Sequence, residues 1–153
     1  MNKMKSEWCE KGRACVEKCA WLGPLLARLI LGVVFVTAGW GKLHHLDQVT
    51  SFFTQIGIPA ASIQAPFVAG VEFVGGLMIL AGFLTRLISI PLAFTMFIAI
   101  VTAKRGDIHS FTDLMGLDEL AYLVMFVWLT CAGAGKISID EWCHKRCEGK
   151  QKK

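Results

Sequence analysis

The chain has 153 residues, of which 54% are hydrophobic and only 18% are charged, with 15 glycines and a formal net charge of +4. Soluble domains average about 45–50% apolar and about 25% charged residues. These values exclude an intrinsically disordered chain and argue against an ordinary soluble domain. Because the apolar residues fall in long runs, which a bilayer requires, the composition indicates a membrane protein.

Four apolar stretches have the length of membrane-spanning helices. They are residues 22–40, 65–84, 87–103 and 117–134. Each has about 17–20 residues, close to the roughly 20 that a helix rising 1.5 Å per residue needs to cross about 30 Å of hydrocarbon. The sequence therefore predicts an all-α integral membrane protein, a four-helix antiparallel transmembrane bundle. Residues 22–134 form its membrane domain, and residues 1–21 and 135–153 form two basic tails that contain cysteines.

The connections between these stretches differ in length. Thr85 and Arg86 alone separate the second stretch from the third, which predicts a tight turn between two antiparallel helices. The connection between the first two stretches is longer and contains Gly57-Ile58-Pro59, a turn signal.

The Lys and Arg residues are distributed unevenly about the predicted spans. Twelve belong to the two tails and the Arg86 turn, whereas three (Lys42, Lys104 and Arg105) belong to the other side. By the positive-inside rule both termini lie in the cytoplasm, so the protein is a multi-pass protein of the plasma membrane. The basic tails suit anionic lipid headgroups. They do not indicate nucleic-acid binding, because no basic patch alternates with stacking aromatic residues.

Two ionisable residues, Arg28 and Glu72, lie well inside predicted spans, where a charge costs several kcal/mol unless it is paired or hydrated. At about 100° per residue, each shares a helix face with glycines. The glycines are Gly32 and Gly39 beside Arg28, and Gly75, Gly76 and Gly82 beside Glu72. Small residues let membrane helices approach closely, so the first two helices are expected to pack face to face.

The position of Glu72 predicts its partner. Helical side chains lean toward the N-terminus of their own helix, which favours Lys42 or Lys104 over Arg28 as the cation that meets Glu72. A candidate buried polar site that opens to the outer face is therefore predicted. It consists of Glu72, Lys42, Arg28, Lys104 and Thr102. The alternative is that Glu72 is a structural hydrogen-bonding group.

Five of the six cysteines lie in the tails. Cys15 and Cys19, like Cys143 and Cys147, are four residues apart, so each pair shares a face if the tails continue the first and fourth helices. Four thiolates could hold zinc or iron. A redox-active thiol pair and inert thiols are the alternatives, since thiols in the cytoplasm stay reduced.

Three segments of the membrane domain carry a composite motif. They are residues 28–43 with Arg28, Gly32, Phe35, Gly39 and Lys42; Gly57-x-Pro59; and residues 72–86 with Glu72, Gly75-Gly76, Gly82 and Thr85-Arg86. The motif resembles that of the DoxX family of small four-helix bacterial membrane proteins, over residues 25–134. The resemblance implies an inner-membrane protein associated with redox chemistry. Family members resemble the small subunit of a thiosulfate:quinone oxidoreductase or are linked with thiol and oxidative-stress partners. Arg28, Lys42, Glu72 and Arg86 match the family's positions, whereas the cysteine-bearing tails are not part of its pattern.

Together these features predict a membrane subunit or partner of a redox system, which holds a quinone or a small oxidisable solute beside Glu72 and Lys42. The sequence has no haem ligand pair, flavin fingerprint or nucleotide-binding loop, so the chain is at most an accessory subunit of an oxidoreductase.

A channel or carrier for a small solute is one alternative. Another is a scaffold that binds a cytoplasmic partner through its tails. Candidate partners are an oxidoreductase and a second copy of the chain. A quinone site predicts a lateral, aromatic-lined opening, whereas a carrier predicts a polar path to Arg28 and Arg86.

Overall fold

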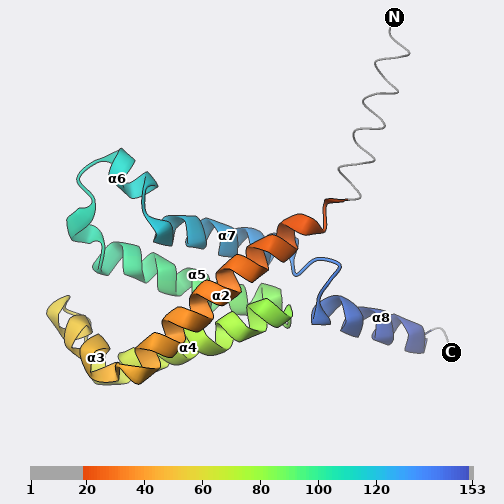
Figure 1. The fold of residues 1–153 in the computed structure, drawn as a ribbon, viewed down its shortest axis with the longest axis horizontal. Coiled ribbons are helices and arrows are strands. Elements are labelled where there is room, and N and C mark those ends of the chain that lie inside the picture. The colour runs from red at the N-terminus through yellow and green to blue at the C-terminus, as the bar shows by residue number, and fades with distance from the viewer. Residues whose placement is uncertain (1–18, 152–153) are drawn as a thin grey trace, which may run out of the picture.

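The computed structural model describes residues 19–151, and these residues are helical, with no strand among them. The helices are α2 (Leu22–His44), α3 (Leu46–Gln55), α4 (Ala61–Ala81), α5 (Thr85–Thr102), the 3₁₀ helix η1 (Arg105–Asp107), α6 (Phe111–Met115), α7 (Asp118–Ala132) and α8 (Ile139–Gln151) (Figure 1). The predicted all-helical class is confirmed.

Three helices, α2, α4 and α5, are long and apolar enough to cross a membrane. The helix α7 has 15 residues and rises about 22 Å, which is less than the roughly 30 Å of a hydrocarbon core. The fourth predicted span therefore stays a prediction. Many large apolar side chains on these helices point outward, such as Val33 on α2, Leu77 on α4 and Phe97 on α5, each about half exposed.

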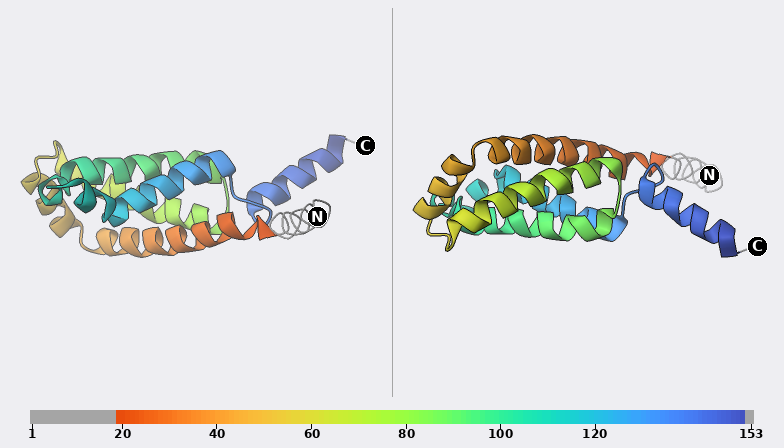
Figure 2. Two further views of the ribbon diagram at one scale, coloured as in Figure 1. Left: turned by 90° about the horizontal axis from the view of Figure 1, so that it is seen from above. Right: turned by 90° about the horizontal axis from the view of Figure 1, so that it is seen from below.

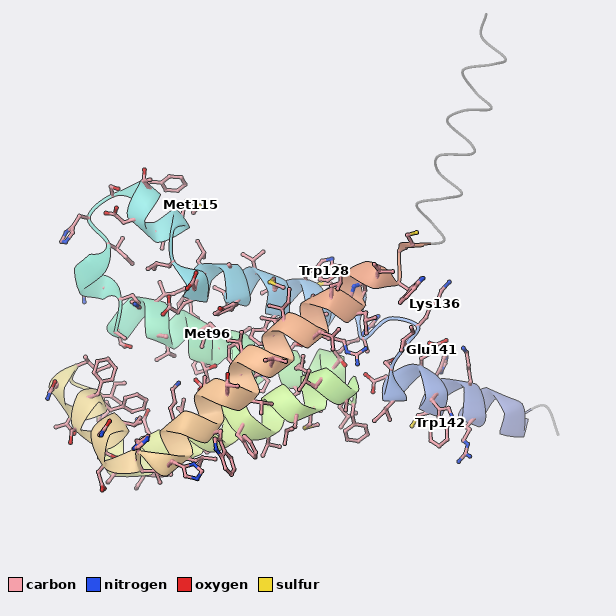
Figure 3. The ribbon with its side chains drawn as sticks, in the orientation of Figure 1. Met96, Met115, Trp128, Lys136, Glu141 and Trp142 are labelled. Carbon is pink, nitrogen blue, oxygen red and sulfur yellow. The ribbon has the colours of Figure 1, made fainter. Side chains whose placement is uncertain are left out.

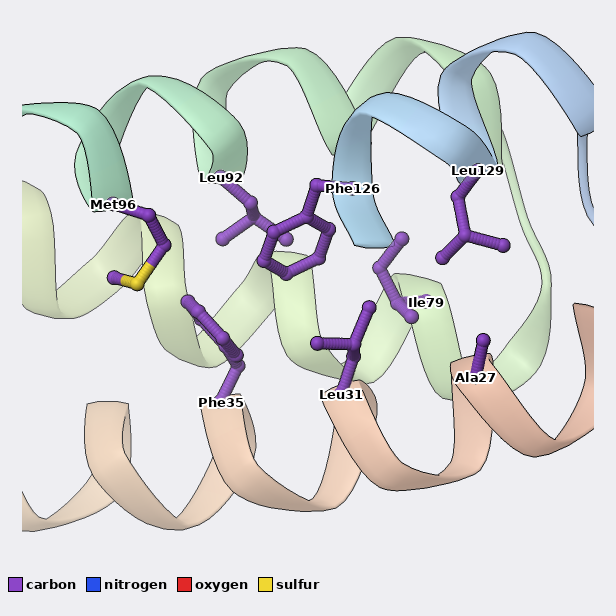
Figure 4. Close-up of a cluster of buried hydrophobic side chains, with 8 residues drawn as sticks. All are labelled: Ala27, Leu31, Phe35, Ile79, Leu92, Met96, Phe126 and Leu129. Atoms are coloured by element: carbon purple, nitrogen blue, oxygen red, sulfur yellow. The ribbon is translucent and has the colours of Figure 1, made fainter. Parts of the chain in front are cut away.

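The long helices run side by side in alternating directions, with α2 packed along α4 and α5 packed along α7 (Figure 2). Their shared core is apolar. It contains Ala27, Leu31, Phe35, Ile79, Leu92, Met96, Phe126 and Leu129 (Figure 4). The rings of Phe35 and Phe126 meet edge to face at a centroid distance of 4.8 Å, an arrangement that aromatic quadrupoles favour. The described chain ends and α8 lie at one end of the molecule, here called the tail end, and α3 and α6 lie at the other, the loop end (Figure 1).

The turn between α4 and α5 lies earlier than the sequence predicted. The helix α4 ends at Ala81 rather than Leu84, because Gly82 adopts a left-handed conformation (φ 67°). The N–H of Phe83 then donates to the carbonyl of Met78 at 2.9 Å, a bond typical of a helix that ends at a left-handed glycine. Thr85 and Arg86, predicted to form the turn, are the first two residues of α5.

The loop end contains helices that the hydropathy pattern did not predict. The helix α3 follows α2 after a single residue and is amphipathic, with Val49, Phe52 and Phe53 on one side. The predicted turn at Gly57-Ile58-Pro59 follows it, with Gly57 in a left-handed conformation (φ 78°). The short α6 begins with a reciprocal capping box between Ser110 and Asp113.

The helices α2 and α4 touch through their backbones at glycines. A methyl group at Gly76 would lie 2.7 Å from the backbone nitrogen of Val36, and one at Gly39 would clash with the backbone of Phe73. A methyl group at Gly32 would likewise meet Leu80. The expected glycine contact between the first two helices is therefore present at these positions. Gly75 instead faces Leu92 of α5, and Gly82 ends α4.

Substitution of Gly76 by Ala is expected to lower the free energy of unfolding by about 1–3 kcal/mol, because α2 must move away from α4 to accommodate the methyl group. Gly70→Ala is the matched control, since a methyl group at Gly70, on the same helix, meets nothing within 4 Å. The control should leave stability unchanged or raise it by up to about 1 kcal/mol. Unfolding by SDS in mixed micelles, followed by circular dichroism, measures both. Equal stability of the two variants would contradict the packing described.

Candidate functional site

Glu72 and Lys42 form an ion pair at the junction of α2 and α4. Glu72 lies in the middle of α4 and is 2% exposed, whereas Lys42 lies in the last turn of α2. The Lys42 Nζ lies 2.6 Å from both carboxylate oxygens of Glu72. The backbone contact between Gly39 and Phe73 holds the two helices at the separation that this pair requires. Of the two cations that the sequence left open, Lys42 meets Glu72, and the Nζ of Lys104 lies instead 3.8 Å from a carboxylate oxygen of Glu119.

A cavity of about 560 Å³ adjoins this pair. Lys42, Glu72, Thr102 and Lys104 of the predicted polar site all line it, together with Glu119. The rest of the wall is mostly apolar and includes Phe52, Phe53, Phe67, Phe94, Met96 and Ala99 (Figure 3 labels Met96). The Thr102 hydroxyl donates to the carbonyl of Ile98 at 2.7 Å. The cavity is thus a hydrophobic chamber with a few polar groups, which is the usual composition of a small-molecule site.

The cavity lies between α4 and α5 and is partly covered by α3. Phe67 of α4 and Phe94 of α5 line it and are also 69% and 62% exposed, so their rings stand where the cavity meets the outer surface of the helices. Val49 and Phe52 of α3 form another part of the wall. Aromatic side chains therefore border the cavity on the side that faces away from the core.

Arg28 belongs to a different place, near the tail end of the molecule. Its guanidinium is buried, and it donates to the carbonyls of Ile79 and Leu80 at the end of α4, both at 2.9 Å. It also donates to the carbonyls of Ala134 and Ile137, at 2.9 Å and 2.7 Å. The carbonyls at a helix C-terminus have fewer intrahelical donors than those in its middle, so Arg28 adds hydrogen bonds where α4 ends. Its grouping with Glu72 in one polar site was wrong.

Asp140, which the sequence reasoning missed, completes the polar cluster around Arg28. Its carboxylate oxygens accept hydrogen bonds from the backbone N–H groups of Leu84, at 2.7 Å, and Thr85, at 3.0 Å, and so cap the start of α5. Its own N–H donates to the carbonyl of Gly82 at 3.0 Å. The sequence signal nearest to Asp140 was Ser138-x-x-Glu141, a capping pattern. It marks the start of α8 but does not indicate the contact with α5. The N–H of Glu141 does donate to the Ser138 hydroxyl, at 3.1 Å.

Two further residues of the motif act by close packing. A Cβ at Gly82 would collide with the Arg28 guanidinium, so only glycine leaves room for it there. Arg86 is exposed, and its Nε lies 2.9 Å from the position that a Cβ of Gly133 would occupy. The side chain of Arg86 therefore rests against the backbone that follows α7.

The tail cysteines are only partly described. Cys19 and Cys143 are exposed free thiols, Cys15 lies outside the described residues, and the side chain of Cys147 is not described. Within residues 19–151, no group of three or more His, Cys, Asp or Glu side chains is arranged to hold a metal. The condition that the C-terminal tail continues the fourth helix is not met. The helix α7 ends before Gly133 (φ 82°), and α8 starts again at Ile139.

Removal of the Asp140 carboxylate is expected to destabilise the protein. Asp140→Ala should lower the free energy of unfolding by about 1–2 kcal/mol, because two N–H groups at the start of α5 lose their acceptor. Glu141→Ala, the adjacent substitution, removes only a surface ion pair with Lys145 and should cost less than about 1 kcal/mol. Thermal unfolding of both variants in the same detergent gives the comparison. A larger loss for Glu141→Ala would overturn the assigned role of Asp140.

Comparisons with known proteins identify the family. The family model of DoxX matches residues 23–105. The chain is 32% identical to "Inner membrane protein YqjF" of Escherichia coli, over 86% of this chain and 99% of that protein. It is 30% identical to "Putative oxidoreductase CatD" of Bacillus subtilis, over 81% of this chain and 89% of that protein. It is 34% identical to "Uncharacterized membrane protein Rv3486" of Mycobacterium tuberculosis, over 78% and 80% respectively. No solved structure gives a significant match. With its motif residues at the two polar clusters described above, the chain belongs to the DoxX family of membrane proteins.

Proposed function

We propose that this protein is a membrane subunit or partner of a redox system and that it binds a quinone in the cavity beside Lys42 and Glu72. The observation that carries the proposal is the composition of this cavity. Its wall is apolar and aromatic, it meets the outer surface of the helices between α4 and α5, and a buried ion pair lies within it. An amphiphile with a flat polar head and an apolar tail fits such a chamber.

The size and shape of the cavity support a quinone headgroup. Its volume of about 560 Å³ is within the range of about 300–1,000 Å³ that is typical of small-molecule sites. Phe52, Phe53, Phe67 and Phe94 offer ring faces and edges to a planar ring. The isoprenoid tail would leave past Phe67 and Phe94 into the lipid, so only the head needs to be enclosed.

The ion pair supplies the polar chemistry that a quinone needs. The Lys42 ammonium carries three N–H donors, and its side chain remains 34% exposed, so it can donate to a quinone carbonyl oxygen while it stays beside Glu72. The Glu72 carboxylate fixes the position of this ammonium beside the bound head. Buried ion pairs contribute little net stability, which supports a functional reason for this one. The electrons would come from an oxidoreductase partner.

The topology that goes with this function is four spans with both tails in the cytoplasm. The helix α7 packs along α5, and its exposed face is apolar, with Val124, Val127 and Trp128 between 42% and 60% exposed. This supports α7 as the fourth span. With the excess of Lys and Arg in the tails, the cavity then lies in the outer half of the membrane.

The interior between the cavity and Arg28 favours quinone binding over solute transport. Leu31, Phe35, Ile79 and Phe126 fill the space between the helices there, and all are buried (Figure 4). Arg28 donates to four carbonyl oxygens of the protein, so its side chain is engaged there. A carrier needs a polar path through this region, whereas a quinone enters and leaves from the side.

Binding of a short-chain quinone to the purified protein in nanodiscs tests the proposal. Ala99→Phe, which fills the cavity, should abolish binding, and Glu72→Gln should weaken it by about tenfold, because the position of the Lys42 ammonium is lost. Ala121→Phe is the matched control, since Ala121 is exposed on α7 and does not line the cavity. It should bind as the wild type does. Isothermal titration calorimetry with ubiquinone and menaquinone analogues provides the affinities.

The partner is tested separately. Affinity purification in mild detergent, followed by mass spectrometry of the proteins and small molecules recovered, should yield an oxidoreductase and a quinone. Recovery of neither, together with equal quinone binding by Ala99→Phe and Ala121→Phe, would refute the proposed function.

A further inference from the structure

A second cavity lies at the tail end of the molecule, far from the Lys42–Glu72 pair. It is a groove of about 620 Å³ where the start of α5, the segment after α7 and the start of α8 meet (Figure 3 labels Lys136 and Glu141). Its charged and titratable lining residues are Arg86, Lys136, His144, Asp140 and Glu141. The proposed function uses none of them.

The two acids of this groove are already engaged within the protein. Both oxygens of Asp140 accept backbone N–H groups of α5, and a carboxylate oxygen of Glu141 lies 3.3 Å from the Nζ of Lys145. Arg86 and Lys136, by contrast, form no ion pair with any residue in the part of the chain that the structure describes. The groove therefore presents two cations that no described carboxylate holds in an ion pair, and they are available to an anion.

Apolar surface continues from the groove along α5. Leu84 and Leu87 line the groove and are 44% and 63% exposed, and Ile90, one turn further along α5, is 55% exposed. These side chains point away from the core, where acyl chains would cover them if α5 spans the bilayer. A ligand that satisfies both parts of this surface is anionic at one end and apolar at the other.

We propose that the groove binds the phosphate headgroup of an anionic phospholipid through Arg86 and Lys136, with the acyl chains along Leu87 and Ile90. The guanidinium of Arg86 suits this role because its planar donors match a phosphate group in pairs. The close contact of Arg86 with the Gly133 backbone holds the guanidinium at the mouth of the groove. This site needs α5 to lie in the bilayer, but it does not depend on quinone binding.

Native mass spectrometry of the full-length protein tests the site. The protein is incubated with phosphatidylglycerol or with phosphatidylethanolamine, which has no net charge, and the fraction of protein with bound lipid is compared. The wild type is expected to prefer phosphatidylglycerol. Arg86→Gln/Lys136→Gln should lower that preference about 30-fold, because each basic residue near the membrane surface contributes about a factor of five. Both side chains are exposed, so the core is unchanged.

Two control variants separate the groove from general charge. Arg105→Gln/Arg146→Gln removes the same charge from exposed residues outside the groove and should keep the wild-type preference. Arg86→Lys/Lys136→Arg keeps the charge and should stay within about threefold of the wild type. A lipid preference that survives Arg86→Gln/Lys136→Gln, or falls equally in the Arg105/Arg146 control, would overturn the proposal.

Inorganic phosphate is added as a competitor. Occupation of the site by phosphate alone, with the affinity of the lipid, would also overturn it in favour of a free-anion site.

Discussion

The backbones of α2 and α4 meet at Gly39 and Gly76, and this close contact sets the geometry of both polar clusters. At one end of the contact it places Lys42 beside Glu72, and at the other it places Arg28 beside the last carbonyls of α4. Side chains larger than glycine would separate the helices and draw both charges away from their partners. A membrane helix pair has little hydrophobic driving force for association, so backbone packing and these polar contacts must hold it together.

The two clusters solve the problem of a buried charge in different ways. Arg28 donates four hydrogen bonds to fixed carbonyl oxygens from two parts of the chain, which suits a structural role because nothing in this arrangement needs to move. Among the residues that the structure describes, Glu72 has one cationic partner, Lys42, which also lines the cavity. A partly exposed lysine on a flexible stem can shift toward a ligand. This difference in hydrogen-bonding partners is the physical reason to propose a function for Glu72 and a structural role for Arg28.

Sequence reasoning predicted the parts of this structure that follow from helical periodicity. The pairing of Glu72 with Lys42 followed from the direction in which helical side chains lean, and the glycine contacts followed from their shared face. The end of α4 was misplaced by three residues, because hydropathy continues through Gly82 and Leu84 while the backbone turns there. The role of Asp140 could not be inferred, since it joins residues 55 and 56 positions apart in a segment assigned to a tail. The cavity depends on how α3 folds over α4 and α5, which the hydropathy pattern does not record.

The bonding of Asp140 to the α4–α5 turn has a mechanical consequence. The first turn of α8 is hydrogen-bonded to Gly82, Leu84 and Thr85. The position of α8 is therefore coupled to the end of α4. Glu72 lies ten residues earlier on the same helix, about 15 Å from Gly82 along its axis. A force applied to α8 would be transmitted to α4 through the hydrogen bond between Asp140 and Gly82. A displacement at the start of α8 would therefore act on the helix that carries Glu72 into the wall of the cavity.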